Sequence, residues 1–244
     1  MSNINEILHI SQSSMLARSM MLDIVSHNLA NSQTIGFKGS RANFQELLDE
    51  TRQNGVLLRA TQVMPEQGAL QITNNPHDLA INGEGYFEVT LPDGSSAYTR
   101  DGSFNLDANL KIVTADGYPL VWGGTIPATA EAMQFNADGN VMVMQGGVWS
   151  SAGTINLSTF DNPSGLTGYG QNLWLESETS GTAQNGQPAT AGFGELVGGA
   201  LEQSNVNLAE EMSRMLALQR GFELSLRSFE NTNQMLSLAI SMRR

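Results

Sequence analysis

The C-terminal stretch, residues 207–242, places mostly apolar side chains at alternating steps of four and three residues. This heptad pattern, sustained over about five repeats, is typical of a long helix that packs against other helices. Asn207 can cap the helix, and Glu210 follows three residues later, as in a capping box. At about 1.5 Å per residue the helix would be about 54 Å long, more than a small domain can cover by itself. The predicted packing line contains Leu208, Met212, Met215, Gln219, Phe222, Leu226, Phe229, Asn233, Leu236 and Ile240.

The N-terminal segment has the same period. Heptad steps from Ile4 to Leu29 predict a second long helix, and a further apolar line runs beside the first one. We expect the two terminal helices to pair as a coiled coil, residues 200–244 against residues 1–31. Copies of the protein or close relatives would cover the remaining faces, whereas a simple two-helix packing within a monomer is the alternative. The N-terminal residues of the predicted seam are Leu8, Met15, Leu22, Val25 and Leu29.

The segment after the first helix contains several breaks. Asn31 and Ser32 can end the helix, and Gly36 permits a left-handed turn. Residues 41–51 show a short helical pattern around Phe44, Leu47 and Leu48. Residues 50–67 look extended and are interpreted as a connector.

The middle of the chain changes from a helical period to a period of two. Asp-Gly and Asn-Gly dipeptides recur through it and predict tight turns between short antiparallel strands. Residues 181–199, rich in Gly and Ala, are expected to be a flexible return to the C-terminal helix. The strands are predicted near residues 85–90, 97–99, 111–114, 141–144, 154–160 and 173–175.

These patterns predict an α+β fold. In it, long N- and C-terminal helices pair as a coiled coil, and an antiparallel all-β middle domain is inserted between them. The expected parts are an N-terminal helix with a following motif at 1–49, an extended connector at 50–67, a β domain at 68–199 and a C-terminal helix at 200–244.

The net charge of −12 lies entirely in the middle of the chain. Residues 61–200 carry two basic and fourteen acidic side chains, whereas both ends are balanced. Such a chain is a poor ligand for nucleic acid or for an anionic membrane. No apolar run approaches the roughly 20 residues of a membrane span, and the N-terminus lacks the pattern of a cleaved secretory signal. We therefore expect no nucleic-acid binding and no direct membrane insertion.

No group of residues forms a convincing catalytic or ligand-binding pattern. The chain has no cysteine, and its three histidines share no metal-ligand spacing. A pair of aspartates could serve a glycoside hydrolase, but most of the candidates flank a turn glycine, where Asp is favoured for backbone reasons. We expect no enzyme activity, no cofactor and no metal. The aspartates considered are Asp93, Asp101, Asp107, Asp116 and Asp138.

Three short motifs stand out at well-separated places in the chain. One is formed by Asn28, Leu29, Ala30, Asn31, Thr34, Gly36, Phe37 and Lys38. The second reads YTRDGSF at residues 98–104, with DLAING ahead of it at 78–83. The third reads LEQSNVN at residues 201–207. Together they resemble the rod and hook family of the bacterial flagellar axis, and the resemblance covers nearly the whole chain.

The resemblance implies a structural subunit that polymerises into a helical tube and transmits torque from the motor to the hook. Family members are similar in being exported through the flagellum's own type III channel. Their terminal helices pair inside the tube and their β domains form its wall. The implied partners are further copies of the chain, other rod and hook subunits and the surrounding ring proteins. The implied location is the periplasm-spanning rod of the basal body.

Two features depart from the family pattern. The segment between Glu46 and Gly68 is shorter than in the distal rod member, which the middle domain resembles most, and is nearer in length to that of the proximal rod member. Gly221 and Phe222 stand where the family usually has Ala and Tyr. A glycine inside a helix costs about 1 kcal/mol, which close helix packing can offset. The alternatives are a hook-type subunit, a secreted adhesin or tip protein with helical anchors and, less favoured, a polysaccharide-acting enzyme.

Overall fold

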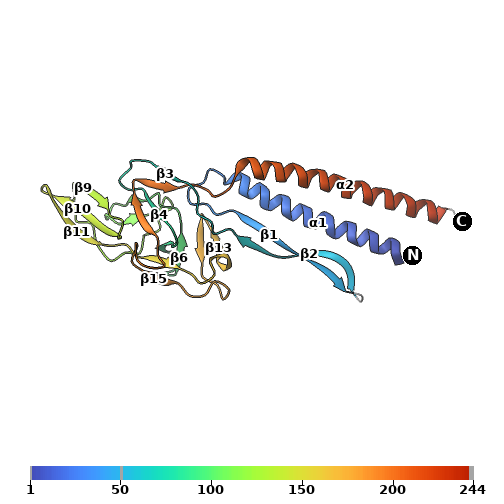
Figure 1. Cartoon of the computed structure of the whole chain (residues 1–244), viewed down its shortest axis with the longest axis horizontal. Helices are drawn as coiled ribbons and strands as arrows, with labels where there is room; N and C mark the ends of the chain where they lie inside the picture. Colours follow the sequence, from blue (N-terminus) through green and yellow to red (C-terminus); the bar gives the residue numbers. More distant parts are fainter. Residues whose placement is uncertain (1, 50–51, 242–244) are drawn as a thin grey trace. The chain divides into compact units, whose positions relative to one another are not determined.

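Among the residues that the structure describes, the first and last elements are α-helices, and the sequence between them is mainly strands (Figure 1). This architecture is seen in a computed structural model that describes residues 2–49 and 52–241. The α+β class therefore agrees with the sequence. Side chains are described for residues 11–43, 61–235, 237, 238 and 241.

The chain divides into two units, each assembled from segments that are distant in sequence. The first unit contains Met1–Ser32, Gly39–Met64 and Val206–Arg244. The second contains Gln33–Lys38 and Pro65–Asn205. The short segment 33–38 therefore belongs to the β-rich unit, although it directly follows the first helix.

The first unit contains both helices, which lie where the heptad pattern predicts them. Helix α1 spans Ser2–Ala30 and helix α2 spans Leu208–Ser241. The side-chain oxygen of Asn207 accepts hydrogen bonds from the backbone N–H groups of Ala209 at 3.1 Å and Glu210 at 3.4 Å. Asn207 is therefore the N-cap of α2, as the sequence predicted.

A β-hairpin completes the first unit. Strand β1 (Ser40–Asp49) pairs antiparallel with strand β2 (Arg52–Val63). The prediction of a short helix at 41–51 is wrong, because residues 41–49 lie in β1. Most of the described part of the connector predicted at 50–67 is β2, and residues 50 and 51 lie outside the described residues. A helix of so few residues is unstable alone, whereas strand pairing satisfies the backbone groups of both segments.

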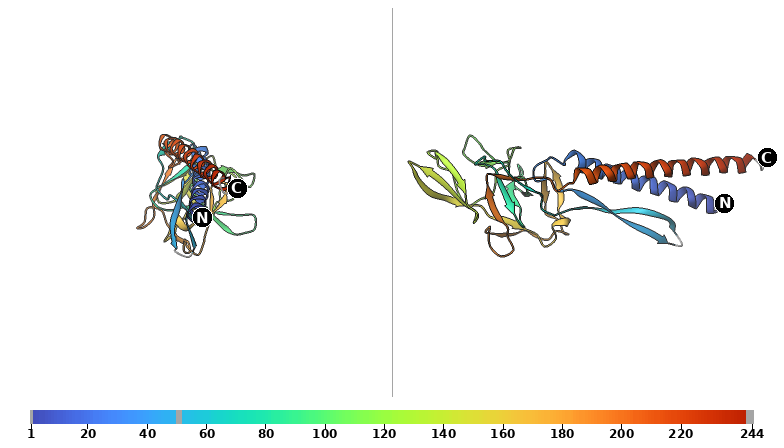
Figure 2. Two further views of the ribbon diagram at one scale, coloured as in Figure 1. Left: turned by 90° about the vertical axis from the view of Figure 1, so that its right-hand side faces the viewer. Right: turned by 45° about the horizontal axis from the view of Figure 1, so that its top comes forward.

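The prediction that the terminal helices pair as a coiled coil is also wrong. Helix α1 contacts the β1–β2 hairpin as well as α2, and Figures 1 and 2 show all three elements alongside one another. A coiled coil would bury one unbroken heptad line on each helix. On α2, however, Leu208 and Met212 are 48% and 51% exposed, and Leu226 is exposed too. The period predicted the helices correctly but not the surface that each one buries.

The second unit is a set of small antiparallel sheets. The largest has the strand order β13-β14-β6-β5, a second has the order β11-β10-β9, and the remaining strands form the pairs β12–β15, β16–β4, β17–β3 and β7–β8. A 3-10 turn, η1 (Pro163–Gly165), lies between β12 and β13. The strands are β3 (Leu70–Ile72), β4 (Leu79–Asn82), β5 (Phe87–Thr90), β6 (Ser96–Thr99), β7 (Asn105–Leu106), β8 (Ile112–Val113), β9 (Ala132–Phe135), β10 (Asn140–Gln145), β11 (Val148–Thr154), β12 (Leu157–Thr159), β13 (Thr167–Gly170), β14 (Leu173–Leu175), β15 (Gln184–Gly186), β16 (Glu195–Gly198) and β17 (Ala200–Glu202).

Two of these pairs join strands from the beginning of the second unit to strands from its end. Strand β16 pairs with β4, and β17 pairs with β3. Residues 181–199 were predicted to be a flexible return but contain β15 and β16, so that prediction is wrong. Residues 200–202 form β17, where the C-terminal helix was expected to begin. Short strands beside glycines carry little local signal, because their partners lie far away in sequence.

Strands that the sequence predicted contribute much of the core, and β4, β9 and β16, which it did not predict, contribute the rest of the strand residues. Phe87 on β5 and Phe104 are almost fully buried, with their rings edge to face and 5.2 Å apart. A smaller cluster joins Tyr86, Tyr98 and Phe160. The main cluster also contains Leu79, Ile81, Val89, Leu91, Ala97, Ile112, Leu120, Ile126, Phe135, Val141, Ile155, Leu157, Leu173 and Leu196.

Gly102 provides a test of this packing. A Cβ atom at Gly102 would overlap the carbonyl oxygen of Leu79, whose N–H donates to the carbonyl of Gly102 at 3.0 Å. We expect Gly102→Ala to displace β4 and to lower the free energy of unfolding by about 3 kcal/mol. Urea denaturation followed by tryptophan fluorescence measures this, because all three tryptophans lie in the second unit.

Gly94→Ala is the matched control. Gly94 has a φ of 85°, but a Cβ atom there meets nothing within 4 Å. Only backbone strain of about 1 kcal/mol is expected. Equal losses in the two variants would contradict the packing described for Gly102.

Candidate functional site

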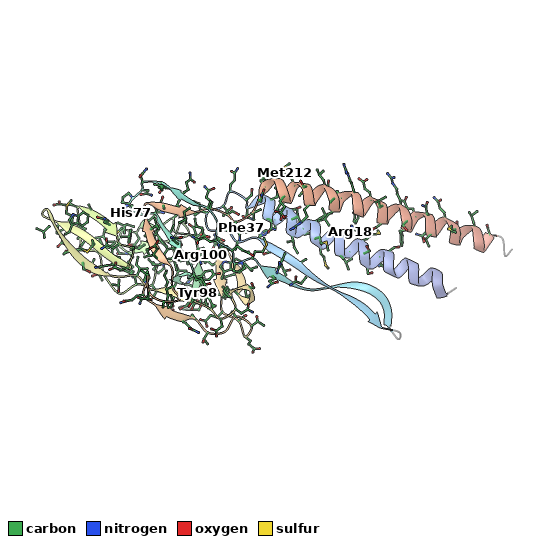
Figure 3. All side chains as sticks on the ribbon, viewed as in Figure 1. Arg18, Phe37, His77, Tyr98, Arg100 and Met212 are labelled. Carbon is green, nitrogen blue, oxygen red and sulfur yellow. The ribbon has the colours of Figure 1, made fainter. Side chains whose placement is uncertain are left out.

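Three charged side chains, one from each sequence motif, meet in the interior of the second unit. Glu202 binds Lys38 through one carboxylate oxygen (Nζ–Oε1 2.5 Å) and Arg100 through the other (Nη1–Oε2 3.2 Å). Their side chains are 0%, 1% and 5% exposed for Glu202, Lys38 and Arg100, and Figure 3 shows Arg100 inside the unit. We call these three residues the charge cluster. It connects the segment after α1, the loop after β6 and the end of β17.

Backbone groups complete the surroundings of the Glu202 carboxylate. The N–H of Gly68 donates to Oε1 of Glu202 at 2.9 Å, and the Lys38 ammonium also donates to the carbonyl of Glu66 at 2.8 Å. The backbone carbonyl of Glu202 accepts from the N–H of Gly36 at 2.7 Å. Buried charges are tolerated when they are paired and hydrogen-bonded in this way. The cluster therefore depends on the exact course of three separate backbone segments.

Two cations share the single carboxylate of the charge cluster. Burial lowers the pKa of the Lys38 ammonium, Glu202 opposes that effect, and the positive charge of Arg100 lowers it further. Arg100 also donates to the carbonyl of Gly83 at 2.9 Å and lies 5.1 Å from the centre of the Tyr86 ring. Within the described part of the chain, the Nε of Arg100 is buried without a hydrogen-bond partner.

The first motif holds backbone segments together. The fully buried amide of Asn28 donates to the carbonyl of Ser40 at 2.8 Å and accepts from the N–H of Ser40 at 2.9 Å, which joins the end of α1 to the start of β1. Gly36 has a φ of 65°, and a Cβ there would lie 2.5 Å from the backbone nitrogen of Asp101. The predicted left-handed turn is therefore confirmed. Of the remaining motif residues, Phe37 and Lys38 are buried, Leu29, Asn31 and Thr34 are half-buried, and Ala30 is exposed.

The second motif is shaped by Asp101. Its Oδ1 accepts hydrogen bonds from the N–H of Ser103 at 2.9 Å and from the hydroxyl of Ser103 at 2.6 Å. The N–H of Asp101 donates to the hydroxyl of Thr99 at 3.0 Å. Burial raises the pKa of the Asp101 carboxyl above its usual value, although the bonds from Ser103 act in the other direction. These contacts fix a turn, which is the backbone role that the sequence indicated for Asp101.

Three of the other aspartates considered as acids also serve turns. Asp93, Asp107 and Asp138 each accept a hydrogen bond from the backbone N–H two residues further along, at 2.8–3.0 Å. Among the residues that the structure describes, no three His, Asp or Glu side chains are placed to hold a metal ion. In the same residues, neither helix has a segment long and apolar enough to cross a membrane.

The structure does not gather the residues of the predicted helical seam on one surface. Val25 is buried, whereas Met15, Leu22, Leu29, Met215, Phe222 and Phe229 are half-buried. Leu208, Met212 and Leu226 are exposed, and Figure 3 shows Met212 near the start of α2. The side chains of Leu8, Leu236 and Ile240 lie outside the described residues.

Helix α2 also exposes apolar side chains that the seam did not include. Leu216, Leu224, Met235 and Leu238 are 55–70% exposed. Together with the exposed seam residues they extend around much of the helix. A helix that is apolar on several sides is normally buried in its final surroundings. The exposed part of α2 is therefore a candidate surface for association.

Gly221 on α2 lies beside Arg18 of α1. A Cβ atom there would overlap the guanidinium group of Arg18 on α1. The glycine therefore makes room for the arginine, in agreement with the close approach expected at this departure from the family pattern. Alanine at this position would require Arg18 to move.

Sequence reasoning missed the charge cluster, although it singled out all three motifs. Arg100 is one of only two basic residues in the acidic stretch 61–200. This rarity could have indicated that Arg100 pairs with a specific carboxylate. No sequence spacing could identify Glu202 as that carboxylate. The bonds between Asn28 and Ser40 were also missed, because they depend on a hairpin that was not predicted.

Comparisons with known proteins define the class of this chain. Residues 80–143 match the model of the flagellar hook protein FlgE/F/G D1 domain. Residues 197–242 match the model of the flagellar basal body rod FlgEFG protein C-terminal region. Arg100 falls in the first match and Glu202 in the second, so the charge cluster connects the two matched regions.

Relatives that match over most of their length support the same family. The chain is 40% identical over 250 residues to the flagellar basal-body rod protein FlgG of Buchnera aphidicola subsp. Schizaphis graminum, covering 94% of this chain and 96% of that protein. It is 35% identical to FlgG of Borreliella burgdorferi, with 95% and 96% covered. For the rod protein FlgF of Mesorhizobium japonicum the identity is 29%, with 88% of each chain covered. The chain belongs to the flagellar hook and basal-body rod family. The predicted greater similarity to FlgG than to FlgF is confirmed.

The charge cluster predicts unequal effects of two substitutions. Glu202→Gln keeps the side-chain shape but leaves Lys38 and Arg100 without a carboxylate, so we expect a loss of about 3–5 kcal/mol in the free energy of unfolding. Lys38→Met leaves the pair of Arg100 and Glu202 balanced and should cost only about 1–2 kcal/mol. Urea denaturation measures both values, with the exposed Lys111→Met as control. A larger loss for Lys38→Met than for Glu202→Gln would contradict the proposed balance of charges.

The raised pKa of Asp101 predicts a specific dependence of stability on pH. Because the folded pKa lies above the ordinary value of 3.8, the folded state binds more protons than the unfolded state between these two values. Stability contributed by Asp101 is therefore present below pH 3.8 and falls as the pH rises through the raised pKa. Asp101→Asn should remove this fall. Melting temperatures measured from pH 3 to 7 for both proteins test it, and parallel curves would contradict it.

Proposed function

We propose that this chain polymerises through its first unit into the helical rod of the flagellar basal body and passes torque from the motor to the hook. Its relatives over nearly the full length are basal-body rod proteins. The predicted function as a structural rod subunit and the predicted location in the flagellar basal body are thereby confirmed. Our proposal adds that the subunits associate through the helices of the first unit.

The observation that carries this proposal is the apolar exterior of α2. Leu216, Leu224 and Leu238 are more than half exposed, on a helix whose sequence period is suited to packing. Copies of the chain that meet along α1 and α2 would remove these side chains from water. Contacts that do not close into a ring generate a helical polymer. The residues that we propose for assembly are Leu8, Met15, Leu22, Val25, Leu29, Leu208, Met212, Met215, Phe222, Leu226, Phe229, Leu236 and Ile240.

Family membership implies assembly with other flagellar axial proteins. We propose more specifically that the chain binds its own copies, neighbouring rod and hook subunits and the ring proteins around the rod. The second unit would form the outer wall, and the charge cluster would keep it rigid under load, because buried ion pairs resist separation of the segments that carry them. This role is structural and needs no catalysis and no cofactor.

An exposed residue of α2 tests the assembly surface. Leu226→Ala removes apolar area at a 39% exposed position. We expect about a tenfold or greater loss of assembled rods, because burial of the missing atoms contributes roughly 1.5 kcal/mol or more at each contact. Basal bodies isolated from cells that carry only this variant measure the yield. Urea denaturation of the second unit should be unchanged.

Arg227→Ala is the matched control, since it truncates an exposed polar neighbour on the same helix. Its rod yield should stay near that of the unaltered chain. Full assembly by both variants would remove Leu226 from the proposed surface. A similar loss in both would point to a general effect on α2.

A further inference from the structure

The second unit contains a cavity of about 450 Å³ beside the charge cluster. Tyr86 and Phe160, whose rings pack edge to face with their centres 5.8 Å apart, form one aromatic wall, and Pro65 and Pro163 also line the space. Arg100 contributes to the same lining. It is 5% exposed and is paired with Glu202. A cavity of this size, mostly apolar and with a few fixed polar groups, has the character of a binding site.

The lining selects a flat apolar group that can also donate a hydrogen bond. Aromatic side chains pack edge to face against Tyr86 and Phe160, and a guanidinium such as that of Arg100 is attracted to an aromatic face. The exposed carboxylates of Glu66 and Glu84 line the same cavity and can only accept hydrogen bonds when ionised. An indole ring combines an aromatic face with a single N–H donor, so tryptophan suits these walls.

The second unit itself exposes such a group on the β10–β11 hairpin. Trp149 is 42% exposed and Val148 is 69% exposed, immediately after a turn in which Gly146 and Gly147 have φ values of 53° and 79°. Trp149 pairs with Met144 across the hairpin, which holds its backbone in a defined register. Figure 1 shows the β9–β10–β11 sheet at one end of the unit. The residues that line the cavity come from other segments, so the hairpin of the same chain does not fill it.

The charge distribution favours contact between the hairpin of one copy and the second unit of another. Residues 61–200 are strongly acidic, and two copies of this region repel each other. Residues 139–160, which include the whole hairpin, contain no charged side chain. The hairpin can therefore approach an acidic neighbour without bringing like charges together.

We propose that Trp149 at the hairpin tip of one copy inserts into the cavity at Tyr86, Phe160 and Arg100 of a second copy. The two surfaces are different parts of one unit, so each copy offers a tip to one neighbour and a cavity to another. Such a head-to-tail contact continues indefinitely unless the rotation closes a ring. The contact rests on the proposed function as a polymerising rod subunit, and it adds a link between β units to the association of the helices.

Disulfide cross-linking tests this contact directly, because the chain has no cysteine of its own. The double variant Val148→Cys/Glu84→Cys places one thiol beside the tip and one at the cavity. Basal bodies are isolated from cells that carry only this variant, oxidised, and run on a non-reducing gel. We expect a ladder of cross-linked multimers that collapses to monomer on reduction.

The matched control is Tyr169→Cys/Glu84→Cys. Tyr169 is a 50% exposed aromatic residue on β13 of the same unit, away from the hairpin. This pair should give monomer alone. Rods that assemble without a ladder in the Val148 pair, or with equal ladders in both pairs, would overturn the tip contact and leave the rod function standing. Basal bodies that lack the unaltered chain altogether would instead overturn the rod function.

A second measurement decides the matter if the cysteine pair prevents rods from forming. Trp149→Ala should lower the yield of assembled rods at least tenfold, whereas Tyr169→Ala should leave it unchanged. Urea denaturation of the purified full chain checks that both variants fold. Equal rod yields for Trp149→Ala and Tyr169→Ala would overturn the proposal.

Discussion

The carboxylate of Glu202 is the interaction on which the second unit depends. It stands between Lys38 and Arg100 with almost no access to water, and its own strand, β17, pairs with β3. A buried carboxylate is stable only while its cations and backbone donors stay in place. Each motif therefore needs the other two, and the same contact fixes the short segment 33–38 in the β-rich unit.

Helices and turns could be predicted from the sequence where the pattern of neighbouring residues determines them. The heptad period predicted both helices, and Asn207 marked the start of α2. The same period did not predict their packing, because it fixes only the spacing of side chains along a helix and not the neighbour that covers them. The hairpin β1–β2 contacts α1, and five of the eight described side chains in the predicted line on α2 are exposed, so the coiled coil was the wrong conclusion.

At and around the charge cluster, too, features set by neighbouring residues were predictable and contacts between distant residues were not. The turn at Gly36 and the turn role of Asp101 follow from the residue types and were predictable. The contact between Lys38 and Glu202 was not, because no pattern relates two residues that are 164 positions apart in the chain. Strands β16 and β17 were missed for the same reason, since their partners β4 and β3 precede nearly all of the second unit.

That separation has a consequence for the order in which the molecule can form. Closing the loop between Lys38 and Glu202 costs conformational entropy before the contacts that stabilise it can form. Chains dominated by such distant contacts fold slowly. The early strands β3 and β4 have no partner, and Lys38 has no counter-ion, until residues 195–202 arrive. A chain that emerges N-terminus first therefore keeps this unit open until shortly before α2 begins. Strands β16 and β17 therefore delay completion of the second unit until nearly the whole chain is available.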